Sequence, residues 1–122
     1  MNLNEWAKEI HKNAVEHGWW DEPRSFTEVI ALCHSELSEA LEEYRSKKPT
    51  TYFTCKCGAK TDSQYICCGK KMKPEGIAVE MADCIIRILD WCGKEGIDIE
   101  QIILTKHEYN KTRPYRHGGK KC

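Results

Sequence analysis

The stretch HSELSEALEE, residues 34–43, decides the fold that the sequence predicts. Apolar residues recur around it at helical spacing, and Ser25 followed three residues later by Glu28 forms a capping box, so a helix is expected from Ser25 to about Lys47. Similar periodicity and end signals recur along the chain of 122 residues. They predict four helices, over residues 4–17, 25–47, 74–92 and 98–112.

Acidic residues in two of these helices occupy positions that a solvated helix face does not explain. On a helical wheel Glu36 falls inside the apolar arc of its helix, and Glu39 borders that arc. The helix expected over residues 74–92 is apolar almost all round, and its polar strip collects Glu80, Asp83, Arg87 and Asp90. If the two strips face each other, four carboxylates converge: Glu36, Glu39, Glu80 and Asp83.

Four converging carboxylates need neutralisation. Each pair of like charges about 4 Å apart costs roughly 4 kcal/mol at an effective dielectric near 20. The cluster therefore either retains protons or binds a hard cation. Mg²⁺ fits best, because it takes a few carboxylate oxygens and leaves coordination positions for water and substrate phosphates. The sequence thus predicts a Mg²⁺ site held by Glu36, Glu39, Glu80 and Asp83.

Two acidic motifs resemble a known family. SELSEALEE followed by VEMADCIIRILD resembles the ExxE and ExxD signature of the MazG-like, all-α nucleoside triphosphate pyrophosphohydrolases. EHGWWDEPRSF before them and KHEYNKTRPYRHGGK after them are similar to that family as well, so the resemblance covers residues 1–46 and 75–120. It implies an all-α fold, an antiparallel four-helix bundle that associates as a dimer or tetramer.

The resemblance also implies an activity and a set of site residues. The reaction is Mg²⁺-dependent cleavage of a nucleoside triphosphate between its α and β phosphates, giving the monophosphate and pyrophosphate. The four acidic residues become metal ligands and the catalytic group. Lys106, Asn110 and Arg113 are candidates for binding the phosphates, and Trp20 is a candidate for stacking the base.

Charge and cysteine content separate one segment from the rest. The zero net charge sums −6 over residues 1–46, +6 over 47–73, −5 over 74–105 and +5 over 106–122. The acidic motifs stand further apart than the family usually has them, and the excess is the segment 48–73. We therefore expect a helical domain formed by residues 1–47 and 74–122, with residues 48–73 inserted as a small subdomain.

The inserted segment carries four of the eight cysteines. Cys55 with Cys57, and Cys67 with Cys68, flank a short polar stretch, and a glycine that allows a tight turn stands near each pair. Four thiolates suit a closed tetrahedral site for structural zinc, in a ribbon too small to fold on its own core. The CCG end is also similar to desulforedoxin-type modules, so iron is the alternative ion.

Three further expectations concern partners and location. The lysines of the insert are compatible with a nucleic-acid surface, with a positive wall that attracts phosphates, or with solubilising charge. A non-catalytic bundle whose basic ribbon binds nucleic acid or a protein is therefore the alternative function. The excess apolar surface of the helix over 74–92 predicts a homo-oligomer. The charged start and the lack of a long apolar run predict a cytoplasmic protein without membrane spans.

Overall fold

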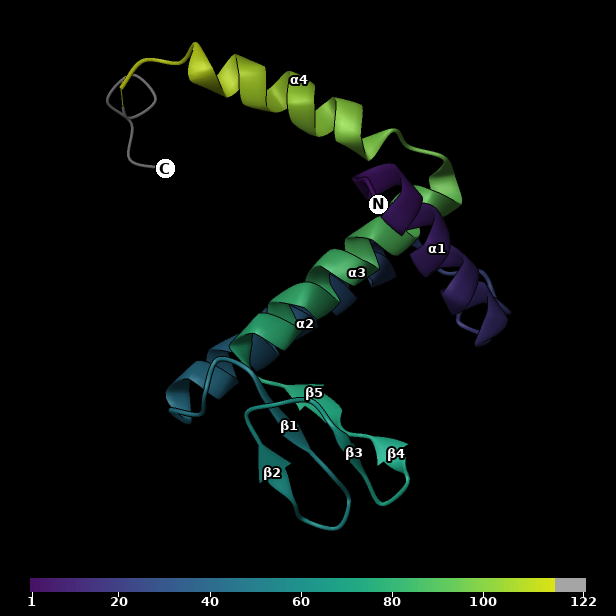
Figure 1. The fold of residues 1–122 in the computed structure, drawn as a ribbon. Coiled ribbons are helices and arrows are strands. Elements are labelled where there is room, and N and C mark those ends of the chain that lie inside the picture. The colour runs from purple at the N-terminus through teal and green to yellow at the C-terminus, as the bar shows by residue number, and fades with distance from the viewer. Residues whose placement is uncertain (116–122) are drawn as a thin grey trace. The chain divides into compact units, whose positions relative to one another are not determined.

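A computed structural model describes residues 1–115 of the chain. Four helices and five short strands lie within these residues, and Figure 1 shows their course along the chain. The helices are α1 (Leu3–Glu16), α2 (Phe26–Arg45), α3 (Ile77–Glu95) and α4 (Ile99–Lys111). The strands are β1 (Tyr52–Thr54), β2 (Lys60–Thr61), β3 (Ile66–Cys67), β4 (Lys70–Lys71) and β5 (Lys73–Glu75). The Gly-Gly-Lys-Lys-Cys sequence of residues 118–122 predicts a frayed end. These residues lie outside the described part of the chain.

Side-chain caps fix two helix starts where the sequence predicts them. The hydroxyl of Ser25 accepts a hydrogen bond from the backbone N–H of Glu28 at 3.2 Å. The carboxylate of Asp98 accepts one from the backbone N–H of Gln101 at 3.1 Å. Each cap satisfies a backbone donor that the first helical turn leaves without a partner. The predicted starts of α2 and α4 are confirmed.

The all-α fold class is wrong, because the segment between α2 and α3 folds as a β ribbon. Strand β1 lies between β2 and β5 in an antiparallel three-stranded sheet, and β3 pairs with β4 in a separate hairpin. Pro74, expected in the first turn of a helix, instead lies opposite Phe53 in the pairing of β5 with β1. A long connection must satisfy its own backbone hydrogen bonds, and here strand pairing does so.

Helix α3 therefore begins later than predicted, at Ile77, directly after the glycine that follows β5. Gly76 has a φ of 115°, and a Cβ at this position would collide with the carbonyl of Thr50. The same Thr50 carbonyl accepts a hydrogen bond from the N–H of Ala78 at 3.1 Å. Only glycine combines this conformation with so close an approach, so Gly76 anchors the first turn of α3 to the chain that leads into β1.

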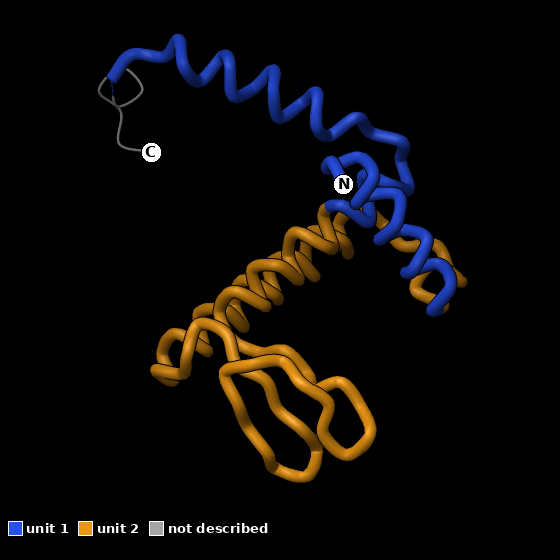
Figure 2. Tube along the Cα trace, in the orientation of Figure 1, with its two compact units in different colours: residues 1–17, 89–122 blue, residues 18–88 orange. Residues whose placement is uncertain are grey.

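The chain divides into two compact units, which Figure 2 shows in blue and orange. Residues 1–17 and 89–122 form one unit, and residues 18–88 form the other. In the first unit Ala7, Leu89 and Cys92 form a buried cluster. A Cβ at Gly93 would collide with the Ala7 carbonyl of α1. Helix α3 passes through this glycine and ends at Glu95, whereas the sequence predicts an end at 92. The predicted split into a helical domain and the insert 48–73 stays a prediction.

The second unit contains α2, the β ribbon and most of α3. Helices α2 and α3 lie side by side and antiparallel, with Cys33 next to Cys84 and Glu39 next to Glu80. Val29, Cys33 and Ala40 are buried on the inner face of α2, whereas Leu37 and Leu41, which fall in the same apolar arc on the wheel, are exposed. This helix pair carries the acidic residues, and the ribbon that joins its two helices borders them.

Helix α4 differs from the predicted bundle helix. None of its residues, all of which are described, is buried, although Ile99 at its start packs on the cluster of the first unit. Within residues 1–115, the helices are too short or too polar to cross a membrane.

Candidate functional site

The acidic residues of α2 and α3 converge, as the sequence predicts. Carboxylate oxygens of Glu36, Glu80 and Asp83 all lie within 4.8 Å of one another. Glu36 is buried with 7% of its surface exposed, and Glu80 and Asp83 are half-buried. Glu39 is exposed but contacts Glu80. Oxygens at this separation lie close enough for one hard cation to contact three carboxylates.

Glu80 carries the clearest electrostatic signature of the cluster. Its Oε2 atom is buried and has no hydrogen-bond partner among the described residues. Burial, then close contacts with the carboxylates of Glu39 and Glu36, raise the pKa of Glu80 from 4.5 to about 8. A buried carboxylate oxygen that no protein group satisfies is costly to keep ionised. Glu80 therefore either holds a proton or contacts a ligand from outside the chain.

Asp83 is perturbed in the same direction. Burial and the negative charge of Glu36 raise the pKa of Asp83, and the positive charge of Arg87 opposes the rise. The carboxylates therefore act on one another as a coupled group, whose proton content depends on what else is bound.

Arg87 belongs to this site, although the sequence alone indicates no role for it. Its Nε and Nη2 atoms both donate to Glu36 Oε1 at 2.9 Å. Its guanidinium also lies 6.0 Å from the ring centre of Trp19. Arg87 was visible in the polar strip of α3, but spacing alone did not reveal its pairing with a glutamate 51 positions earlier. Asp90, placed in the same strip, instead contacts His11 Nδ1 at 2.8 Å in the other unit.

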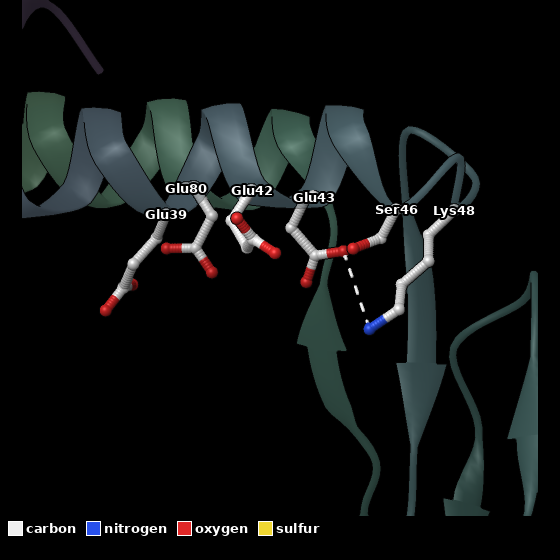
Figure 3. A pocket seen from close by; sticks show the side chains of 6 residues that line it. All are labelled: Glu39, Glu42, Glu43, Ser46, Lys48 and Glu80. Carbon is white, nitrogen blue, oxygen red and sulfur yellow. Dashed lines mark ion pairs between the residues drawn. The ribbon is translucent and has the colours of Figure 1, made fainter.

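A pocket of about 190 Å³ opens beside the cluster, towards the ribbon. Figure 3 shows the acidic side chains that line it projecting to the same side of the helices. Lys48 contributes the positive charge in the pocket lining, and its Nζ atom lies 4.0 Å from Glu43 Oε2. The lining residues are Glu39, Glu42, Glu43, Ser46, Lys48 and Glu80.

The tryptophans lie in the same unit as the acidic cluster. Trp19 has 51% of its surface exposed, and Trp20 is half-buried. The guanidinium of Arg24 lies 5.4 Å from the ring centre of Trp19 and 5.8 Å from that of Trp20. Because Trp19 also contacts Arg87, it is the aromatic ring linked to the acidic cluster. The choice of Trp20 for base stacking stays a prediction.

The predicted phosphate-binding residues lie on α4 or just after it, and all are exposed. Lys106 Nζ lies 5.1 Å from the ring centre of Tyr109, and Arg113 Cζ lies 5.9 Å from the same ring. Asn110 occurs one helical turn after Lys106 on the same helix. These residues belong to the unit that does not contain the acidic cluster, so their contact with substrate stays a prediction.

The four cysteines of the ribbon also converge. Sγ atoms of Cys55, Cys57, Cys67 and Cys68 all lie within 4.8 Å of one another, and all four thiols are free. Hydrogen bonds from the Ala59 backbone and the neighbouring thiols lower the pKa of Cys57 to about 7. A second ligand set, made of soft sulfur atoms, thus accompanies the oxygen set.

Fold and ligand sets together define a small α/β chain with candidate sites for a hard cation and for a thiophilic one. A family model described as the Barwin family matches residues 14–121, and the chain belongs to this family. Neither a curated protein nor a solved structure gives a match.

The family match corrects the resemblance drawn from the sequence. Assignment to the MazG-like family is wrong, and so is the all-α bundle that it implied. The motifs that carried it are acidic pairs three residues apart, and any pair of helices with an acidic strip can present them. The family match names no site residues and no activity, so a function for the acidic cluster rests on its geometry.

Proposed function

We propose that this chain is a Mg²⁺-dependent nucleotide pyrophosphohydrolase, which cleaves a nucleoside triphosphate between its α and β phosphates to the monophosphate and pyrophosphate. One observation carries the proposal. Within residues 1–115, Glu80 Oε2 is buried without a hydrogen-bond partner, in a cluster where oxygens of Glu36, Glu80 and Asp83 lie within 4.8 Å of one another. A hard cation would satisfy that atom and neutralise the cluster.

The ligand set favours Mg²⁺ over a softer metal. Three carboxylates from two helices supply oxygen ligands, and the pocket beside them leaves room for water and phosphate oxygens. When bound, the ion would polarise phosphoryl oxygens and lower the pKa of a coordinated water. Glu36, Glu80 and Asp83 would hold it, and Glu39, exposed at the pocket, would orient the attacking water.

Positive and aromatic groups near the cluster suit a nucleotide. Lys48 lines the pocket and lies at a distance of 4.0 Å from Glu43, where a phosphate could compete for its charge. Trp19 offers an exposed ring next to Arg87, and Trp20 is the alternative ring for stacking a base. Lys106 and Asn110 on α4, and Arg113 just after it, are proposed to contact the phosphates.

Pyrophosphate release tests the activity directly. Purified protein is incubated with a panel of ribonucleoside and deoxyribonucleoside triphosphates, with Mg²⁺ or with EDTA, and pyrophosphate is quantified. We expect release that requires Mg²⁺ and falls about a hundredfold or more in Glu39→Gln, the scale seen when one group that stabilises transition-state charge is lost. Glu9→Gln removes the same charge from an exposed site on α1 and should leave the rate unchanged.

Two results would remove the proposal. One is the absence of pyrophosphate with every nucleotide, in a preparation that calorimetry shows to be folded. The other is a Glu39→Gln variant with the rate of the wild type. Binding of Mg²⁺ without turnover would instead support the cation site alone and would exclude the hydrolase.

The second candidate function is nucleic-acid binding by the ribbon. Lys56, Lys60, Lys70 and Lys71 are all exposed on it, and the ribbon offers few acidic side chains to pair with them. Binding of this kind weakens steeply with salt, since each neutralised phosphate releases counterions. It would survive Glu80→Gln and would be lost in Cys67→Ser, whereas the hydrolase shows the opposite order of sensitivity.

Self-association is proposed for the helical face away from the acidic pocket. Leu37 and Leu41 of α2 are 44% and 48% exposed, and Met81 and Ile85 of α3 are 47% and 53% exposed. Apolar residues at helical spacing that stay exposed on neighbouring helices mark an interface. Light scattering after size exclusion should give a dimer or tetramer, and Ile85→Glu should yield a monomer.

A cytoplasmic location is proposed on the state of the thiols. All the cysteines within residues 1–115 are free, and free thiols are typical of reducing compartments.

A further inference from the structure

The β ribbon contains a thiol cluster that the proposed hydrolase does not use. Cys55 and Cys57 lie in the turn that follows β1, and Cys67 and Cys68 lie at the turn between β3 and β4. These two turns belong to different sheets. Their Sγ atoms nevertheless gather within 4.8 Å of one another.

Backbone geometry holds both turns in place. In the first, the N–H of Gly58 donates to the carbonyl of Cys55 at 2.9 Å, and the N–H of Cys55 donates to the carbonyl of Ala59 at 3.0 Å. In the second, Cys68 has a φ of 52° and Gly69 a φ of 74°. A residue with a side chain rarely adopts the left-handed region, and it persists there only where its surroundings require it. Cys68 adopts this conformation where it and the adjacent Cys67 both place their Sγ atoms in the cluster.

The sulfur separations match a tetrahedral metal site and do not match disulfides. Cys57 Sγ lies 3.6 Å from Cys67 Sγ, and Cys67 Sγ lies 3.9 Å from Cys68 Sγ. Four sulfurs bound at about 2.3 Å around tetrahedral zinc lie about 3.8 Å apart. A disulfide would require about 2.05 Å, and all four thiols are free.

The ribbon needs such a site because its core is small. Its strands have two or three residues, and Tyr52 and Met72 are its buried hydrophobic residues. A segment of this size folds stably when a metal or a disulfide links its parts. Zinc suits this purpose better than iron, since it has no redox chemistry and its structural sites are closed by four protein ligands.

We propose that Cys55, Cys57, Cys67 and Cys68 bind one structural Zn²⁺, which holds the ribbon in the form that borders the acidic pocket. The link to the pocket runs through Tyr52, whose hydroxyl donates to Glu43 Oε1 and Oε2 at 3.0 and 3.1 Å. Glu43 lines that pocket. The inference stands whether or not the chain hydrolyses nucleotides, because it predicts a metal and a local order that are measured without substrate.

Metal analysis of the full chain tests the site. Protein purified without chelators should contain one zinc per chain, and replacement by Co²⁺ should give the thiolate-to-cobalt charge-transfer bands of a tetrahedral sulfur site. Cys67→Ser should lose both signals. Cys92→Ala is the matched control, because it removes a buried α3 thiol outside the cluster and should retain one zinc per chain.

Hydrogen exchange keeps the proposal testable if Cys67→Ser disturbs the ribbon. In the zinc-bound protein the N–H groups of Cys55, Gly58 and Met72, which form backbone hydrogen bonds, should exchange slowly. In Cys67→Ser, or after zinc removal, they should exchange about tenfold faster or more, while amides of α2 keep their protection. Equal protection with and without zinc would overturn the proposal. Binding of iron in place of zinc, or disulfides detected by mass spectrometry, would overturn it as well.

Discussion

Replacement of Glu80 by glutamine separates the electrostatics of the acidic cluster from its fold. The substitution keeps the shape of the side chain and removes its negative charge. In metal-free protein, burial and the neighbouring carboxylates raise the pKa of Glu80 from 4.5 to about 8, so the folded state holds a proton that the unfolded state has released between these two pH values. The free energy of unfolding of the wild type should therefore fall as pH rises through this window.

The size of the effect follows from the shift and from the openness of the site. A pKa change from 4.5 to about 8 corresponds to an upper bound of roughly 5 kcal/mol. Glu80 is half-buried and lines a pocket open to solvent, so screening reduces this bound, and we expect about 1–2 kcal/mol. Glu80→Gln should match the wild type near pH 4 and exceed it by that amount near pH 9, or by roughly 3–8 °C in Tm.

Urea titrations in EDTA at a series of pH values measure the difference, with Glu9→Gln as the control that removes a charge from an exposed site. Saturating Mg²⁺ should then make the wild type more stable than Glu80→Gln. The wild type should gain about 2.7 kcal/mol at a hundredfold excess over Kd, while Glu80→Gln gains little. A metal-free Glu80→Gln variant less stable than the wild type near pH 9, or an equal gain from Mg²⁺ in both proteins, would refute the reasoning.

Three further substitutions test the packing around the site, each by urea denaturation. Arg87→Gln should cost about 1–3 kcal/mol in EDTA, because it leaves the buried Glu36 carboxylate without its partner, and an unchanged stability would contradict the pairing. Gly76→Ala should cost roughly 2 kcal/mol or more, since its methyl group meets the Thr50 carbonyl at a φ of 115°. Gly93→Ala should cost roughly 1–3 kcal/mol, since its methyl group meets the backbone of α1; full stability would show that the two helices separate freely.

Helix positions were predictable because their signals are local. Ser25 and Asp98 stand before apolar periodic stretches, and both cap their helices as expected. Pro74 misled the prediction, since proline suits the first turn of a helix and also suits a short strand at the edge of a sheet. The choice between these depends on the pairing of β5 with β1, some 20 residues earlier, and this long-range contact leaves no periodic trace in so short a strand.

The convergence of the acidic residues was predictable for a different reason. Glu36 occupies an apolar arc and Glu80 occupies the polar strip of a helix that is apolar elsewhere, so each must face a neighbour. Which neighbour each one faces depends on the rotation of the two helices, and the sequence leaves that rotation open. The pairing of Arg87 with Glu36 and the contact of Arg87 with Trp19 therefore appear first in the structure.

Arg87 also explains how the cluster can exist before any cation binds. Of the carboxylates that meet, Glu36 is the most buried, and it is the one that accepts both contacts from the guanidinium. Asp83 feels the same positive charge, which lowers its pKa against the effect of burial. Glu80 Oε2 accepts no hydrogen bond from the described residues, and the pKa of Glu80 is raised to about 8. In the metal-free protein Glu80 is therefore the carboxyl group that holds a proton near neutral pH. Fixed positive charge thus stabilises one side of the cluster, and the uncompensated side is the one that opens to the pocket, where a cation would displace a proton from Glu80.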